Sequence, residues 1–124
     1  MLDTNALSAW ADADAALLCV LPKDRLWRLP VVALGEFLYG IRRSREHSRL
    51  ERWIEQVKGA CALIAIDADT ADCYAQIREE LRSAATPIPE NDIWIAAFCR
   101  QYDSALASRD KHFDKVHDLR RVGW

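Results

Sequence analysis

Short apolar segments of strand length alternate along this chain with longer segments whose apolar residues recur at helical spacing. The apolar residues from Leu34 to Ile41, for example, follow the i, i+3, i+4, i+7 pattern of a helix that buries one face. Strands that alternate with helices pair in parallel, because a helix carries the chain back to the end at which the preceding strand began. We therefore predict an α/β fold, namely an α/β/α sandwich with a small and mostly parallel sheet. The length of 124 residues suits one domain of this kind, spanning residues 1–124.

Capping residues and prolines delimit the expected elements. We expect Thr4 or Asn5 to cap the first helix, and Asp67 to cap a long one. Pro22 and Gly59 are expected to end two other helices. The first expected helix contains Leu7 and Trp10, and the other helices are expected at residues 13–21, 32–41, 44–58, 67–84 and 89–101. The first expected strand ends at Asp3, and the other strands are expected at residues 26–32, 61–66, 104–108 and 119–124.

The composition excludes several classes of protein. The longest apolar run, residues 93–99, is far shorter than the roughly 18 residues of a membrane span, and the first residues carry no secretory signal pattern. Four glycines are too scattered for a glycine-rich phosphate loop. The four cysteines form no C-x-x-C pair and no zinc pattern with the three histidines, and their apolar neighbours predict buried free thiols in a reducing compartment. We therefore expect a cytoplasmic protein with no membrane contact.

Four acidic residues stand where an α/β fold gathers functional groups. In open parallel sheets these groups lie beyond the carboxyl ends of the strands. Asp3 ends the first expected strand, and Asp110 follows the strand at 104–108 by two residues. Asp92 lies in the first turn of the helix after Pro89, and Glu36 lies beside the apolar stripe of its own helix. We expect the four carboxylates to converge, although each also has a purely structural interpretation as a cap, a turn residue or a solvated helix position.

Four carboxylates in one cleft repel one another and raise one another's pKa values. A bound divalent cation relieves this repulsion, and an all-oxygen ligand set favours Mg²⁺ or Mn²⁺ over Zn²⁺. Such a cation suits phosphodiester hydrolysis, because it neutralises phosphate charge and activates water. The residue types therefore point to metal-dependent chemistry on a phosphodiester.

Four motifs occur in order along the chain. They are Leu2-Asp3-Thr4-Asn5, Glu36 on its helix, Pro89-Glu90-Asn91-Asp92-Ile93-Trp94-Ile95-Ala96-Ala97, and Ser108-Arg109-Asp110 followed by Phe113. Together they cover essentially the whole chain, and the first and third are the most specific. The chain resembles a PIN domain, and more closely the VapC toxin ribonucleases of bacterial toxin–antitoxin pairs.

The resemblance implies a metal-dependent endoribonuclease whose catalytic and metal-binding acids are Asp3, Glu36, Asp92 and Asp110. It implies that Asp3 and Asp92 are the firmest metal ligands. Asp110 would complete the site directly or through water, and Glu36 would bind the metal or orient the attacking water. The expected products keep a 5′-phosphate and a 3′-hydroxyl.

Further roles follow from the same resemblance. Asn5 and Ser108 would hold the carboxylates in place by hydrogen bonds. Asp114 remains an alternative to Asp110 as the fourth acid.

The distribution of charge bears on RNA binding. The chain has 17 Lys and Arg residues against 19 Asp and Glu, with a sequence pI near 5.9, which argues against a uniformly basic surface. Setting the four cleft acids aside leaves 17 bases against 15 acids. Arg109 and Lys111 flank the expected cleft, so they are the candidates for contact with RNA phosphates.

The resemblance also implies protein partners. These are a second copy of the chain, forming a homodimer, and a cognate antitoxin whose C-terminal segment covers the acidic site. Four apolar side chains are either core residues or the lining of a groove that receives this segment. They are Trp10, Phe37, Ile41 and Trp53.

Two other functions remain open at this point. An aspartate after the first strand also begins the haloacid-dehalogenase phosphatases, which use aspartyl-phosphate chemistry, but these carry D-x-D where this chain has Asn5. A non-catalytic PIN-like binding module would keep the same cleft without hydrolysis. The first strand is also very short, so either it is short in the protein or its native start lies upstream of Met1.

Overall fold

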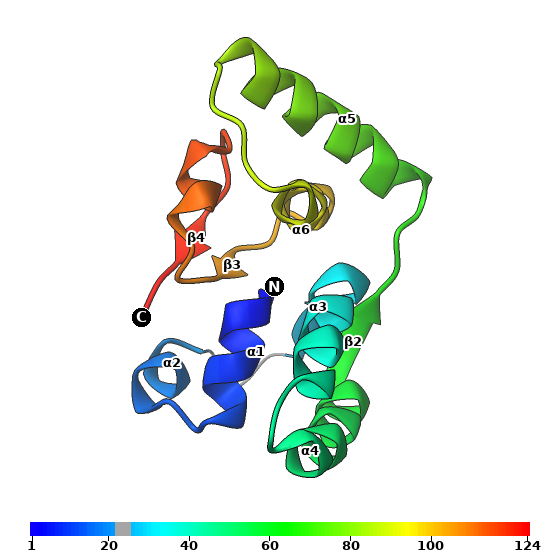
Figure 1. The fold of residues 1–124 in the computed structure, drawn as a ribbon. Coiled ribbons are helices and arrows are strands. Elements are labelled where there is room, and N and C mark those ends of the chain that lie inside the picture. The colour runs from blue at the N-terminus through cyan, green and yellow to red at the C-terminus, as the bar shows by residue number, and fades with distance from the viewer. Residues whose placement is uncertain (22–25) are drawn as a thin grey trace.

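The strands of the protein pair in parallel (Figure 1). The computed structural model describes residues 1–21 and 26–124. β1 (Trp27–Pro30) pairs with β2 (Cys61–Ile64), and β3 (Leu106–Ala107) pairs with β4 (Arg121–Val122). Four of the expected strands therefore form, and each is shorter than expected. They are the strands expected at residues 26–32, 61–66, 104–108 and 119–124.

Leu2 joins these two strand pairs. It forms a parallel bridge with Ala107 of β3, and its backbone N–H donates to the carbonyl oxygen of Arg28 in β1 at 3.0 Å. The order across the sheet is therefore β2, β1, Leu2, β3, β4. This central position explains why so short an apolar segment before Asp3 is sufficient, because its neighbours on both sides satisfy its backbone.

Helices occupy the connections between the strands. They are α1 (Thr4–Ala11), α2 (Ala15–Val20), α3 (Val31–Arg42), α4 (His47–Ala60), α5 (Ala68–Ser83), α6 (Glu90–Gln101) and a short 3₁₀ helix, η1 (Lys111–Lys115). Figure 1 shows α5 packed beside α6 at one end of the molecule, and α1, α2 and α4 at the other. The predicted α/β class with a small parallel sheet is confirmed. Among the described residues, every helix is too short or too polar to cross a bilayer.

Local sequence sets where the helices begin. The Asp67 carboxylate accepts from the backbone N–H of Thr70 at 2.9 Å, and the Thr70 hydroxyl accepts from the N–H of Asp67 at 3.2 Å. This reciprocal pair is a capping box, and it confirms the predicted start of α5. The cap of α1 is Asp3, which accepts from the N–H of Thr4 at 2.6 Å, so the prediction of Thr4 or Asn5 as the cap is wrong.

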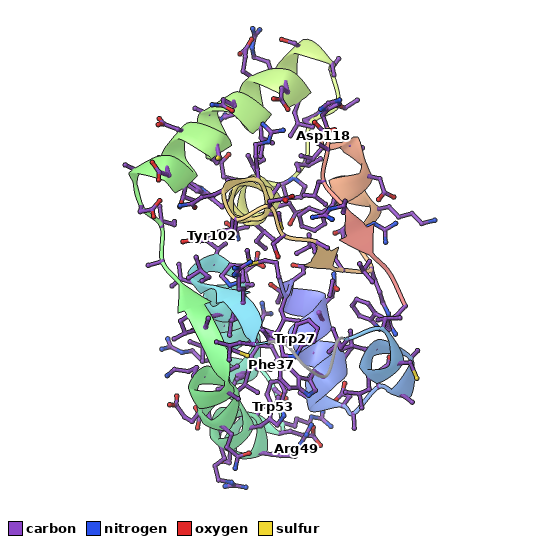
Figure 2. All side chains as sticks on the ribbon, turned by 180° about the vertical axis from the view of Figure 1, so that it is seen from behind. Trp27, Phe37, Arg49, Trp53, Tyr102 and Asp118 are labelled. Carbon is purple, nitrogen blue, oxygen red and sulfur yellow. The ribbon has the colours of Figure 1, made fainter. Side chains whose placement is uncertain are left out.

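Aromatic side chains pack the lower part of the core (Figure 2). The rings of Trp10 and Trp53 meet edge to face with centroids 5.8 Å apart, and the Phe37 ring lies 5.5 Å from that of Trp53. Phe37 and Ile41 are almost fully buried. All four residues therefore contribute to the core, and Phe37 and Ile41 also line a groove beside Glu36.

Two element boundaries and two cysteines differ from expectation. Gly59 lies inside α4, because the chain passes from Ala60 directly into β2 and needs no left-handed residue there. Residues 31 and 32 belong to α3 rather than to the preceding strand. Cys61 and Cys99 are buried free thiols as predicted, but Cys19 is exposed and Cys73 is half-buried. The expected helix stop at Pro22 lies outside the described residues; α2 ends at Val20.

Candidate functional site

One cleft collects the four acids from four separate segments. Asp3 follows the central Leu2, Glu36 lies on α3, Asp92 lies in the first turn of α6, and Asp110 precedes η1. All four line the same cleft, together with Thr4, Asn5, Ser8 and Pro89. The fold thus brings together the residues that the sequence singled out, as the rule of strand carboxyl ends predicts. Their roles stay predictions.

Asp3 is the most enclosed of these acids, with only 5% of its surface exposed. The Asn5 amide and the Ser108 hydroxyl both donate to its Oδ2 atom at 2.6 Å. Burial raises the pKa of the Asp3 carboxyl, the hydrogen bond from Ser108 opposes this, and the nearby Glu36 and Asp110 carboxylates add to the rise. Asn5 and Ser108 therefore fix the direction of Asp3, in the geometry expected of groups that orient a metal ligand.

Glu36 is held by two neutral donors. The Thr4 hydroxyl donates to its Oε2 atom at 2.5 Å, and the Asn91 amide donates to its Oε1 atom at 2.6 Å. These bonds tie α3 to the beginnings of α1 and α6 at the rim of the cleft. Neither contact could be predicted from the sequence, because Thr4 lies 32 positions and Asn91 55 positions from Glu36, and only the fold brings them together.

Asp92 and Asp110 face each other across His112. The Nδ1 atom of His112 lies 3.3 Å from Asp92 Oδ2 and 3.1 Å from Asp110 Oδ1. Asp92 Oδ2 and His112 Nδ1 are both buried, yet neither makes a hydrogen bond to any residue that the structure describes. Burial, and then the charges of Asp3 and Asp110, raise the pKa of Asp92 to about 6. Sequence reasoning missed His112, whose only signal was its place two residues after Asp110.

These residues fit a divalent cation. The cleft offers four carboxylates, and burial followed by mutual repulsion raises the pKa values of two of them, Asp3 and Asp92. It also offers a buried carboxylate oxygen of Asp92 that has no hydrogen-bond partner among the described residues. Oxygen donors of this kind are the usual ligands of Mg²⁺ and Mn²⁺. The arrangement is therefore suited to hold such an ion beside a bound phosphate.

Other predicted residues lie away from this arrangement or at its edge. Asp114 is held by Arg121 through two contacts, of 2.6 and 2.9 Å, and does not line the cleft, so the geometry favours Asp110 over Asp114 as the fourth acid. The Arg109 guanidinium pairs with Asp14 at 2.5 Å and lies over the ring of Trp124. Lys111 is exposed on η1.

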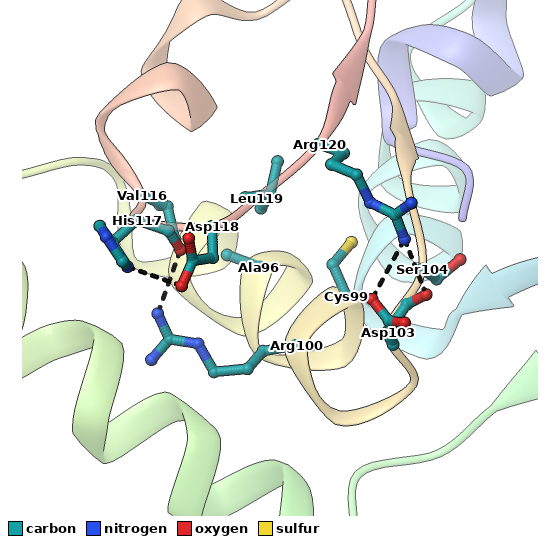
Figure 3. Close-up of a pocket in the computed structure, with 10 residues that line it drawn as sticks. All are labelled: Ala96, Cys99, Arg100, Asp103, Ser104, Val116, His117, Asp118, Leu119 and Arg120. Carbon is teal, nitrogen blue, oxygen red and sulfur yellow. Dashed lines mark hydrogen bonds and ion pairs between the residues drawn. The ribbon is translucent and has the colours of Figure 1, made fainter.

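A second cavity, of about 120 Å³, lies between α6 and the segment that leads to β4 (Figure 3). Its basic side chains already have acidic partners. Arg100 makes two contacts with Glu80, of 2.9 and 2.8 Å, and Arg120 pairs with Asp103 at 3.1 Å. We therefore place the functional site in the acidic cleft rather than in this cavity.

The sequence profile of the PIN domain family, described as "PIN domain", matches residues 1–119. The chain belongs to the PIN domain family. This PIN-domain chain is 26% identical over 95 residues to Ribonuclease VapC4 of Mycobacterium tuberculosis, covering 75% of this chain and 73% of that protein.

Solved structures share its fold over the full length. The VapBC2 complex from Rickettsia felis, bound to a DNA fragment from their promoter, superposes with a TM-score of 0.86 at 22% identity, covering 100% of this chain and 97% of that chain. VapBC-1 from nontypeable Haemophilus influenzae superposes with a TM-score of 0.83 at 21% identity, covering 100% and 96%. These likenesses confirm the predicted PIN-like sandwich.

Removal of the Ser108 hydroxyl is expected to weaken metal binding about 10- to 100-fold. Ser108 is fully buried, donates to Asp3, and accepts from the Asn5 amide at 3.1 Å and from the backbone N–H of Asp110 at 3.0 Å. The Ser108→Ala variant removes one of the hydrogen bonds that orient the Asp3 carboxylate, and calorimetric titration with Mn²⁺ will detect the loss of affinity. The exposed Ser83→Ala is the matched control. Equal affinities for both variants would contradict this role.

The stability of the metal-free protein is expected to depend on Asp92. Its pKa of about 6 lies above the ordinary value of 3.8, so between these pH values the folded state binds more protons than the unfolded state. The free energy of unfolding therefore falls as the pH rises from about 4 to about 6, and the Asp92 carboxylate keeps it lowered above pH 6. At neutral pH the Asp92→Asn variant should be more stable than the wild type by roughly 1–2 kcal/mol.

Urea unfolding in the presence of a chelator measures this difference. The gap between Asp92→Asn and the wild type should be small at pH 4 and widest above pH 6. A gap that is constant from pH 4 to pH 8 would show that the Asp92 carboxylate is not destabilised in the folded protein.

Proposed function

We propose that the protein is a Mg²⁺- or Mn²⁺-dependent endoribonuclease and the toxin of a toxin–antitoxin pair. The convergence of Asp3, Glu36, Asp92 and Asp110 in one cleft of a PIN fold carries this proposal. The relative named Ribonuclease VapC4 and the VapBC complexes among similar structures support it.

Each of the four acids has a task in the proposed reaction. Asp3 and Asp92 would hold the cation, and Asp110 would complete its ligands. When bound, a divalent cation neutralises phosphate charge and lowers the pKa of water. Glu36, fixed by Thr4 and Asn91, orients the attacking water or joins the ligands. Water would attack the phosphorus with the 3′-oxygen as the leaving group, so the products would keep a 5′-phosphate and a 3′-hydroxyl, as the resemblance to the VapC ribonucleases implies.

RNA would approach over the start of η1, where Lys111 is exposed. Arg109 lies next to Asp110, and its guanidinium would contact a phosphate by exchanging Asp14 for the substrate. Half of the Arg109 side chain is exposed (52%), so this exchange needs no change in the fold.

The antitoxin would cover a groove that adjoins the acids. This groove is lined by Phe37, Ile41 and Leu50 on its apolar side and by Glu36 and Arg49 on its polar side. A segment with apolar and basic side chains would fit this lining and reach the cleft, because Glu36 belongs to both. We also propose that the toxin forms a homodimer, as the resemblance implies.

Removal of the metal tests the proposed activity. The purified protein with millimolar Mg²⁺ or Mn²⁺ should cleave RNA into fragments with 5′-phosphates, and excess EDTA should abolish cleavage. Cleavage that persists in EDTA would exclude metal-dependent hydrolysis. Metal binding without cleavage of any RNA would support the alternative of a non-catalytic module.

A further inference from the structure

His112 lies among the cleft acids, and the proposed reaction gives it no task. Its Nδ1 atom approaches both Asp92 and Asp110, at 3.3 and 3.1 Å. The ring is half-exposed, but Nδ1 itself is buried and makes no hydrogen bond, and the same holds for the facing Asp92 Oδ2. Buried polar atoms that face each other without a bond call for a common partner.

The spacing of these atoms is that of ligands around one ion. Asp92, Asp110 and His112 each offer one ligand atom, and these atoms lie within 4.8 Å of one another. Neighbouring ligands of an octahedral ion, each about 2.1 Å from it, are separated by about 3 Å. The two observed distances of 3.3 and 3.1 Å match this separation.

We propose that His112 Nδ1 is a metal ligand of this cleft and makes the site prefer Mn²⁺ over Mg²⁺. The inference rests on the proposed metal-dependent function and names the ion that this function uses. Mg²⁺ is held by oxygen atoms, whereas an imidazole nitrogen favours a first-row transition-metal ion. An aspartate cleft without this nitrogen would bind both ions as hard cations.

The competing role for His112 is that of an internal counter-ion. A protonated imidazole between Asp92 and Asp110 would offset their charge, and a metal ion would then have to displace it. The two roles predict opposite effects of removing the imidazole. If the imidazole is a metal ligand, its removal weakens Mn²⁺ binding. If it is a counter-ion that the metal must displace, its removal tightens Mn²⁺ binding.

The His112→Asn variant separates these roles, because the asparagine Oδ1 atom stands close to the place of Nδ1 and supplies oxygen instead of nitrogen. The matched control is His117→Asn, since His117 is 79% exposed, pairs with Asp118 and lines the other cavity (Figure 3). Calorimetry on the full chain gives the dissociation constants for Mn²⁺ and Mg²⁺. Electron paramagnetic resonance of bound Mn²⁺ reports whether nitrogen is among its ligands.

We expect the wild type and His117→Asn to bind Mn²⁺ more tightly than Mg²⁺ and to show nitrogen coupling. In His112→Asn the coupling should vanish and the preference for Mn²⁺ should fall about tenfold. His112→Ala should lose Mn²⁺ affinity while keeping a wild-type circular dichroism spectrum.

Two results would overturn this inference and leave the proposed function intact. They are Mn²⁺ binding without nitrogen coupling in the wild type, and tighter Mn²⁺ binding in His112→Ala. Failure of the wild type to bind either ion at millimolar concentration would instead contradict the proposed function itself.

Discussion

The Asp92→Asn variant is expected to lose roughly 100- to 1,000-fold of the ribonuclease rate while keeping its fold. Asp92 stands in the first turn of α6, is 14% exposed, and has one carboxylate oxygen without a hydrogen bond. Asparagine has the same shape, so the change removes a charge and a metal ligand without opening the core. The measurement is the initial rate of RNA cleavage at saturating Mn²⁺, with circular dichroism and metal titration alongside.

Asp114→Asn is the matched control for this variant. Asp114 is an aspartate of η1, and Arg121 holds the pKa of its carboxyl below the ordinary value. It does not line the cleft, so its amide variant should keep the wild-type rate. A wild-type rate for Asp92→Asn, or an equal loss in both variants, would remove Asp92 from the catalytic machinery.

Truncation of Leu2 is expected to cost about 3 kcal/mol of the free energy of unfolding. Leu2 is completely buried and sits between the two strand pairs, so Leu2→Ala leaves a cavity in the middle of the sheet. Urea unfolding of the metal-free protein measures the loss. Leu63→Ala on β2 is the control, because Leu63 is 46% exposed and its truncation should cost under about 1 kcal/mol. Equal losses would mean that Leu2 is not central to the core.

The position of the acids was predictable because it depends on local signals. Asp3 and Asp110 follow apolar runs, Asp92 follows a proline that precedes a helix, and Glu36 borders an apolar stripe. A parallel sheet then brings these points to the same edge. The α/β fold could be predicted for the same reason, whereas the PIN family was indicated by the resemblance of the four motifs. The catalytic roles of the four acids remain predictions.

The partners of these acids were not predictable, since they depend on distances that only the packed chain defines. Asn91 stands beside Asp92 in sequence but donates to Glu36, and His112 approaches Asp92 from twenty residues away. The boundary error at Gly59 has a similar origin, because the direct passage from α4 into β2 is set by the pairing of β2 with β1. Glycine alone did not specify the end of the helix.

The Leu2 bridge also has a consequence for the order of events during synthesis. Asp3 leaves the ribosome 105 residues before Ser108, which donates to it. Contacts of such large sequence separation form late, and domains complete their folding only when the last paired segment has emerged. A growing chain that still lacks residues 105–110 therefore has Asp3 without β3 beside it and without the hydrogen bond from Ser108. Such a chain has no assembled cleft, so the four acids come together only after residues 105–110 have been made.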